Sequence, residues 1–323
     1  MLNFAIIGAG AIAHKMSATI VEMDKVNAYA IASRNLSKAE KFVEQYGFSK
    51  AYGSYEEMLA DTEIDLVYIA TPHSHHFRHA KAALNAGKNV LCEKSFTVNA
   101  QQAKDLITLA REKNLLLTEA IWTRYMPSRK MIDDIIDSGI IGEIKNVCAN
   151  IGYELSDVVR LHDPKLAGGA LLDLGVYLIN FARMVLGDEI ESIDTSVIFE
   201  RGVDISESIT IKYKGNKLAV MQCGANSVHS RMGVIMGTKG FIEVININNP
   251  EVIKVYNSEY KLISEQTVPT QISGYEYQVE ACIKAIENGN IECSEMPHAE
   301  TIKVMEIMDD IRKSWDYEIP LLD

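Results

Sequence analysis

The stretch FAIIGAGAIA, residues 4–13, decides the fold of the first part of the chain. A short apolar run ends at Gly8, and a helical pattern begins at Ala11. Gly8 permits a tight turn, Gly10 lets a pyrophosphate approach the backbone, and an alanine at 13 allows the helix to pack closely on the strand. The first amides of such a helix can bind phosphate. The stretch therefore predicts a dinucleotide site that includes Gly8, Gly10, Ala11 and Ile12.

Two other interpretations of this stretch exist. A plain strand–helix turn would show the same glycines. A methyltransferase loop for S-adenosylmethionine is the main competitor, but such a loop usually has a third glycine where Ile12 stands.

Apolar runs alternate with amphipathic segments through the first 121 residues. This alternation predicts a parallel sheet with helices on both faces, as in a doubly wound Rossmann domain. The expected strands lie near residues 2–8, 28–33, 65–71, 89–94 and 115–121, and the expected helices near 11–23, 36–46, 75–87 and 99–114.

The second part is rich in β-type runs, which predicts an α+β domain built on one large, mostly antiparallel open sheet. We therefore expect an α/β protein with a nucleotide-binding domain, residues 1–120, and a substrate domain, residues 121–323. A final helix near 298–315 should pack back on the body. The expected strands are at 144–154, 190–200, 207–215, 217–224 and 231–245.

Composition excludes several classes of protein. The chain has 323 residues, 47% of them hydrophobic and 24% charged, which is the balance of an ordinary globular protein. A net charge of -12 repels nucleic acid and anionic membranes on average. The five cysteines show no metal-ligand spacing, and the N-terminal run has no basic residues before it. We expect a cytoplasmic protein with reduced thiols and no membrane-spanning helix.

The end of the second strand predicts the type of dinucleotide. An NAD site would have an acidic residue there to bond the ribose hydroxyls. The chain has Ser33 and Arg34 instead, which can bond a 2′-phosphate, and Lys38 follows one helical turn later. We therefore expect NADP(H) to be preferred over NAD(H). The alternative is that Arg34 is a solvated turn residue with no role in cofactor binding.

Two further strand ends carry reactive side chains. TPHSHH, residues 71–76, follows one strand, and CEKS, residues 92–95, ends the next. Ligands of doubly wound sheets lie at these ends, so Lys94 is expected beside the nicotinamide, where its cation can orient a substrate oxygen. The cofactor residues expected here are Thr71, Pro72, His73, His76, Glu93 and Lys94.

Taken in order, these motifs resemble the Gfo/Idh/MocA oxidoreductases. The resemblance rests on GAGAIA, ASRN, TPHSHH, CEKS and GGALLDLGVY, with a terminal HAETIKVMEIMDDIRKSW, and it covers nearly the whole chain. EAIWTR, residues 119–124, is similar to the dimeric dihydrodiol dehydrogenases within that family. Ser95 stands where the family usually has proline.

The resemblance implies that Lys94, Asp173 and Tyr177 are catalytic. In a helix, Asp173 and Tyr177 would share one face, since they are four residues apart. A phenol, with an ordinary pKa of about 10, needs a nearby cation to exchange its proton near neutrality, and Lys94 is expected to supply it. Tyrosine in place of the histidine of many family members argues against an inositol dehydrogenase. Residues expected to shape the substrate pocket are Trp122, Arg124, Tyr153 and Arg160.

The expected activity is hydride transfer between NADP(H) and a carbonyl or hydroxyl carbon of a small polyol, dihydrodiol, dicarbonyl or sugar. A sugar enzyme similar to glucose–fructose oxidoreductase or an anhydro-sugar reductase is the alternative, and a non-catalytic NADPH-binding regulator is a second. The histidines at 73, 75, 76 and 79 lack a further ligand in sequence, so no metal is expected. The resemblance also implies a homodimer or higher oligomer through the open sheet.

Overall fold

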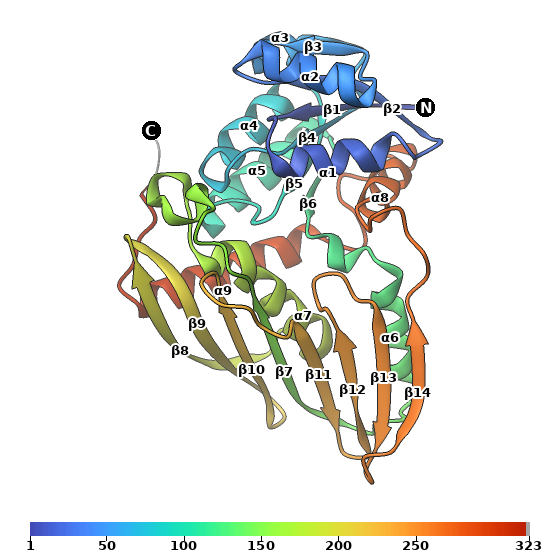
Figure 1. The fold of residues 1–323 in the computed structure, drawn as a ribbon, viewed down its shortest axis with the longest axis vertical. Helices are drawn as coiled ribbons and strands as arrows, with labels where there is room; N and C mark the ends of the chain where they lie inside the picture. The colour runs from blue at the N-terminus through green and yellow to red at the C-terminus, as the bar shows by residue number, and fades with distance from the viewer. Residues whose placement is uncertain (321–323) are drawn as a thin grey trace. The chain divides into compact units, whose positions relative to one another are not determined.

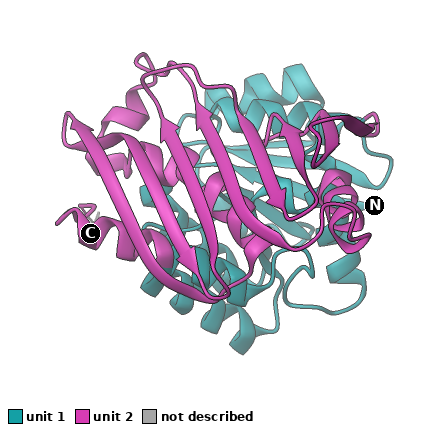
Figure 2. Cartoon of the chain, turned by 90° about the horizontal axis from the view of Figure 1, so that it is seen from below, with its two compact units in different colours: residues 1–125, 271–306, 322–323 teal, residues 126–270, 307–321 magenta. Residues whose placement is uncertain are grey.

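The computed structural model describes residues 1–320, which form two compact units (Figure 1). Neither unit is continuous in sequence. The first comprises Met1–Tyr125 and Gln271–Glu306, and the second comprises Met126–Thr270 and the segment that begins at Ile307 (Figure 2). The predicted division into two functional domains at residue 120 stays a prediction. The two compact units differ from that division, because residues 271–306 belong to the first unit.

The first unit is built on a parallel sheet of six strands in the order β3-β2-β1-β4-β5-β6. This is the predicted Rossmann arrangement, and the fold class is confirmed. Strand order reverses between β1 and β4, which is the point where doubly wound sheets bind nucleotides. The strands are β1 (Leu2–Ile7), β2 (Val26–Ala32), β3 (Lys50–Tyr52), β4 (Leu66–Ile69), β5 (Asn89–Glu93) and β6 (Leu117–Ala120).

Helices α1, α2, α4, α5 and α9 follow the predicted periodicity, and α2 is ended by Gly47 in the left-handed conformation, whereas α8 was not predicted. Helix α1 ends at Ile20, three residues before its predicted end. The sequence interpretation missed β3 and α3, because three and five residues are too few to show a period. The helices are α1 (Ala11–Ile20), α2 (Leu36–Tyr46), α3 (Tyr55–Leu59), α4 (His73–Asn85), α5 (Ala100–Lys113), η1 (Trp122–Arg124), α8 (Glu276–Glu287) and α9 (His298–Ser314), which runs on into the second unit.

Strand register aligns the carboxyl ends of the sheet. Ile7 lies opposite Ala32 on one side and Ile69 on the other, and Ile69 lies opposite Cys92. The residues that follow β1, β2, β4 and β5 therefore emerge at one edge. This edge carries the predicted cofactor residues.

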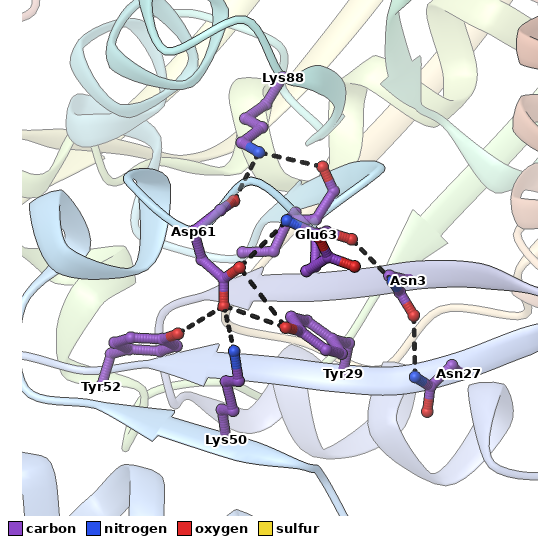
Figure 3. A network of polar contacts seen from close by, with 9 residues as sticks. Asn3, Asn27, Tyr29, Lys50, Tyr52, Asp61, Glu63 and Lys88 are labelled. Atoms are coloured by element: carbon purple, nitrogen blue, oxygen red, sulfur yellow. Dashed lines mark hydrogen bonds and ion pairs between the residues drawn. The ribbon is translucent and has the colours of Figure 1, made fainter.

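A polar network in the first unit is centred on Asp61, which precedes β4 (Figure 3). Its carboxylate accepts hydrogen bonds from Lys50 Nζ at 2.7 Å, Tyr52 Oη at 2.7 Å and Tyr29 Oη at 3.1 Å. Lys88 Nζ donates to the Asp61 carbonyl oxygen at 2.6 Å. Burial raises the pKa of Asp61, but the hydrogen bonds outweigh burial and hold that pKa well below its usual range.

The second unit contains an eight-stranded sheet in the order β14-β13-β12-β11-β7-β10-β9-β8 (Figure 1). Every neighbouring pair is antiparallel except β7 and β10, so the predicted large, mostly antiparallel sheet is confirmed. The strands are β7 (Ile144–Gly152), β8 (Ile190–Glu200), β9 (Val203–Tyr213), β10 (Lys217–Gly224), β11 (Met232–Gly237), β12 (Gly240–Ile245), β13 (Val252–Asn257) and β14 (Leu262–Thr267), with helices α6 (Pro127–Asp137), η2 (Val159–His162), η3 (Pro164–Leu166), η4 (Leu171–Gly175) and α7 (Val176–Leu186).

One apolar segment of the second unit departs from the sequence analysis. Pro164–Leu186 is long and apolar enough to cross a membrane, and the sequence analysis found no such stretch. Within the fold, 89% of its most apolar window is buried by protein. Helix α7 packs against β7 and β10, so its apolar residues form the core of this unit.

Replacing Asp61 by asparagine should destabilise the first unit. The asparagine side chain has the shape of the aspartate but cannot form its charge-assisted hydrogen bonds, which are worth about 1.5–3 kcal/mol each. We expect part of this energy to be lost from the free energy of unfolding. Because folding lowers the pKa of Asp61, its contribution is present above the unfolded pKa of about 4 and disappears as the pH falls through the folded value.

Urea unfolding between about pH 7 and pH 2 measures this contribution. Wild type and Asp61→Asn should differ at neutral pH and converge in acid. Asp24→Asn, which changes an exposed carboxylate of the same unit, is the control. Equal stability of wild type and Asp61→Asn at neutral pH would contradict the prediction.

Candidate active site

The glycine-rich turn has the predicted geometry. Gly8 has φ +104°, and a Cβ on it would lie 2.8 Å from the Ala70 carbonyl oxygen, so no larger residue fits between β1 and β4. Gly10 precedes α1, and a Cβ there would meet no described atom within 4 Å. Among the described residues, no side chain caps α1. An N-terminus without a side-chain cap, next to a glycine with open space around it, suits a phosphate.

Basic and imidazole side chains gather beyond the end of β2. Burial raises the pKa of the Tyr55 phenol, and the positive charges of Arg34 and then Arg78 oppose that shift. The same two arginines act on His75, where burial and then Arg78 lower the pKa. Burial followed by Arg78 lowers the pKa of His79 to about 3. Tyr55, Arg78 and the imidazoles beside them thus extend the predicted Ser33 and Arg34 pair.

The sequence interpretation missed Tyr55 and Arg78 in this cluster, which lie on α3 and α4. The basic character of HHFRH, residues 75–79, was the only sequence signal for Arg78, and Tyr55 had none. Ser33 accepts a hydrogen bond from the Asn35 amide at 3.2 Å, and Lys38 is exposed on α2. In the described part of the chain, no group of three or more His, Cys, Asp or Glu side chains is arranged to hold a metal ion.

The loop that follows β4 leads directly into α4. Pro72 precedes the helix, and Thr71 Oγ1 lies 3.1 Å from His79 Nδ1. His73 is buried with its ring 5.6 Å from that of His76. His76 is fully buried, and both of its ring nitrogens lie 2.8 Å from backbone carbonyl oxygens, Ser95 O and Thr71 O.

Lys94 begins a short loop at the end of β5, and the peptide bond to Ser95 is cis. The Lys94 amide donates to Glu93 Oε2 at 3.2 Å, and the Phe96 amide donates to Glu119 Oε1 at 3.2 Å. Burial raises the pKa of Glu119 to about 7, although Arg124 and the Phe96 amide oppose the shift. Protein groups on both sides therefore hold the backbone of the predicted catalytic loop.

Trp122 and Arg124, predicted to shape the pocket, are anchored by the returning segment of the first unit. Trp122 stacks on Tyr275 at 4.2 Å between ring centroids, and Arg124 pairs with Glu300 at 2.8 Å. Sequence reasoning could not find Tyr275 and Glu300, because more than 150 residues separate them from their partners.

In the second unit, Asp173 and Tyr177 lie on consecutive helical segments. The sequence interpretation placed them in one regular helix, but Asp173 belongs to the π-helical turn η4 and Tyr177 to the first turn of α7. Such turns occur frequently at functional sites. Asp173 Oδ1 lies 3.0 Å from Arg160 Nη1, so the predicted catalytic aspartate and one predicted substrate residue form an ion pair.

The two glycines before these residues approach protein rather than open space. A Cβ on Gly168 would lie 2.5 Å from the Leu161 carbonyl oxygen, and one on Gly169 would lie 2.3 Å from Asp204 Oδ1. Asp204 Oδ2 in turn accepts a hydrogen bond from the Leu171 amide at 2.6 Å. The glycine pair therefore lets β9 hold the start of the helix that carries Asp173.

Tyr153 lies in a second polar cluster of this unit. Its hydroxyl donates to Asn248 Oδ1 at 3.0 Å, and Arg231 Nη1 lies 3.3 Å from the same hydroxyl. Arg231 also bonds Asn246 Oδ1 at 3.3 Å. These residues come from the ends of β7, β11 and β12, and the sequence interpretation found only Tyr153 among them.

Comparison with known proteins identifies the family. Residues 2–121 match the oxidoreductase family GFO_IDH_MocA with its NAD-binding Rossmann fold, and residues 130–243 match the GFO/IDH/MocA C-terminal domain. The chain belongs to this family. It is an oxidoreductase of the CH–OH/C=O type with a dinucleotide-binding Rossmann fold.

Relatives match along the whole length of the chain. It is 34% identical to trans-1,2-dihydrobenzene-1,2-diol dehydrogenase of Danio rerio, over 97% of this chain and 96% of the relative. The Homo sapiens enzyme of the same name is 30% identical, over 99% and 98%. The resemblance stated from the motifs is therefore confirmed.

Solved structures show the same fold. A 3-ketoreductase from Actinomadura kijaniata, in complex with TDP-benzene and NADP, has a TM-score of 0.86 at 25% identity, over 96% of each chain. Levoglucosan dehydrogenase, in complex with NADH and levoglucosan, has a TM-score of 0.85 at 20% identity, over 99% of this chain and all of the other.

Gly169→Ala should destabilise the protein more than an alanine at an unobstructed glycine. A side chain at positive φ costs about 1–2 kcal/mol, and overpacking against Asp204 adds about 1–3 kcal/mol. Gly139→Ala is the matched control, because Gly139 has φ +68° and no described neighbour near its Cβ. Chemical unfolding compares the two, and an equal loss for both variants would argue against the Asp204 contact.

Proposed function

We propose that this protein is an NADP(H)-dependent oxidoreductase that interconverts a carbonyl and a hydroxyl carbon of a small dihydrodiol, dicarbonyl, polyol or sugar. When bound, the nicotinamide supplies or accepts the hydride. The observation that carries the cofactor preference is the pair of arginines, Arg34 and Arg78, around Tyr55 at the end of β2.

The residues present fit a phosphorylated dinucleotide. Gly10 and the uncapped start of α1 leave room for a pyrophosphate. Beyond β2, Arg34 and Arg78 are both exposed and can form charge-assisted hydrogen bonds with a 2′-phosphate. An acidic side chain, which would bond the ribose hydroxyls of NAD, is missing from Ser33-Arg34-Asn35.

The catalytic proposal assigns one task to each of three side chains. Tyr177 gives a proton to the reacting oxygen or takes one from it. Lys94 donates a hydrogen bond to that oxygen and stabilises negative charge on it. Asp173, held by Arg160 at 3.0 Å, orients the reacting groups. Similarity to relatives named as dihydrodiol dehydrogenases favours a diol or dicarbonyl as the substrate of this protein. A sugar substrate is the alternative, which a substrate screen would detect.

Two further expectations remain proposals. We propose a homodimer formed through the large sheet, because Ile198 and Val220 on β8 and β10 are 58% and 43% exposed. We also propose a cytoplasmic location. All five cysteines are unpaired thiols, which suits a reducing compartment.

Tyr177→Phe should lower kcat by about 10²–10⁴-fold, because the ring remains but the exchangeable proton is lost. Lys94→Met should cause a loss of similar size, while NADPH still binds to both variants. Turnover of NADPH with dicarbonyls, dihydrodiols and sugars, combined with fluorescence titration of NADPH, measures both effects. Near-normal turnover of either variant would refute the role assigned to that residue.

Replacing either arginine should weaken NADPH binding selectively. Each charge-assisted bond to the 2′-phosphate is worth about 1.5–3 kcal/mol, so Arg34→Gln and Arg78→Gln should each raise the NADPH dissociation constant by about 10–100-fold. The dissociation constant for NADH should hardly change. Lys41→Gln, at an exposed cation of α2, is the control. Wild-type protein that binds NADH as tightly as NADPH would overturn the preference.

A further inference from the structure

His76 makes an unusual pair of hydrogen bonds in the first unit. Its Nδ1 lies 2.8 Å from Ser95 O, and its Nε2 lies 2.8 Å from Thr71 O. The side chain is fully buried, so water cannot replace either partner. Each ring nitrogen therefore faces a backbone carbonyl oxygen at hydrogen-bond distance.

Carbonyl oxygens only accept hydrogen bonds, and a neutral imidazole has a single N–H group. A neutral His76 would bond one carbonyl and turn a nitrogen lone pair toward the other. At 2.8 Å that contact would be repulsive, and the second carbonyl would lose its bond to the buried ring. Only the ring with a proton on both nitrogens satisfies both oxygens.

The two carbonyls belong to the two loops that carry predicted site residues. Thr71 follows β4, and Ser95 is the residue after Lys94. We propose that His76 is a positioning residue, held with two protons, that ties these loops together and so fixes the backbone beside Lys94. This inference rests on the proposed role of Lys94 in catalysis.

Other groups complete the hold on the lysine loop. Glu93 Oε2 accepts from the Lys94 amide, Glu119 Oε1 accepts from the Phe96 amide, and Cys92 Sγ lies 3.6 Å from Phe96 O. The Ser95 carbonyl is the part of this loop that His76 holds. Without that bond, the loop would keep its flanking contacts but lose the one next to the lysine.

Titratable groups surround the bridge from several elements. On α4 itself, His73 lies 5.6 Å away between ring centroids, and His79 interacts with His76 electrostatically. The facing loop after β5 contributes Lys94, with Glu93 before it, and β6 contributes Glu119. The two carboxyl groups favour a charged ring, whereas the lysine and the other imidazoles oppose it. The carbonyl pair decides the outcome in favour of two protons.

The protonation state can be measured directly on wild-type protein. Nitrogen-15 NMR of histidine-labelled protein at about pH 8, where an ordinary histidine is neutral, should show one ring with both nitrogens protonated. That signal should vanish in His76→Gln. A spectrum in which His76 carries one proton at this pH would overturn the inference.

A kinetic test separates positioning from simple stability. His76→Gln should lower kcat by about 10²-fold, because small displacements of a catalytic group are that costly, while the NADPH dissociation constant changes much less. His298→Gln is the matched control: His298 is also buried, with Nε2 2.8 Å from Leu117 O and Nδ1 3.3 Å from Glu292 Oε2, so it does not join two carbonyls of the loops that carry site residues. It should lose stability but keep its kcat.

The outcomes distinguish the two proposals. Normal kcat in His76→Gln, with an inactive Lys94→Met, would overturn the positioning role and leave the proposed function intact. An active Lys94→Met would overturn the catalytic role of Lys94, and the positioning role with it, whatever the NMR spectrum shows.

Discussion

Parallel pairing in register is the constraint on which the first unit depends. Because Ile7, Ala32, Ile69 and Cys92 lie side by side across the sheet, the chain leaves four strands at the same edge. Every predicted cofactor residue lies at one of these strand ends or in the loop and first helical turns that follow it. A shift of one residue in β4 or β5 would turn its side chains to the opposite face and move Thr71 or Lys94 away from this edge.

Close approach of backbone segments is the second constraint, and glycine makes it possible in both units. Gly8 lets β1 run against Ala70, and Gly169 lets the start of η4 run against Asp204. The first was expected from the dinucleotide fingerprint. At the second, the atoms that approach the glycine are those of the Asp204 side chain. A glycine pair in a sequence indicates that another group lies close to the backbone, and only the fold shows whether that group is a ligand or part of the protein.

The predicted cofactor site carries positive charge although the chain as a whole is negatively charged. The chain carries a net charge of -12, yet Arg34 and Arg78 flank one phenol at the end of β2. The carboxyl groups near the lysine loop, Glu93 and Glu119, are buried and bond backbone amides. They therefore organise the loop rather than repel an anionic ligand at the surface.

The sequence by itself determined the Rossmann fold, the β-rich second part and the family, because each rests on local periodicity or on short motifs. It also indicated Lys94, Asp173 and Tyr177, whose roles remain proposals. Short elements such as β3 and α3 escaped, since they show no period.

Only the tertiary structure decided which distant residues meet. Arg78 joins Arg34, Tyr275 stacks on Trp122, and Asp204 holds the turn before Asp173, in each case across a long stretch of chain. It also showed that His76 uses both nitrogens on backbone carbonyls. Such contacts depend on packing between elements far apart in sequence, which no local pattern encodes.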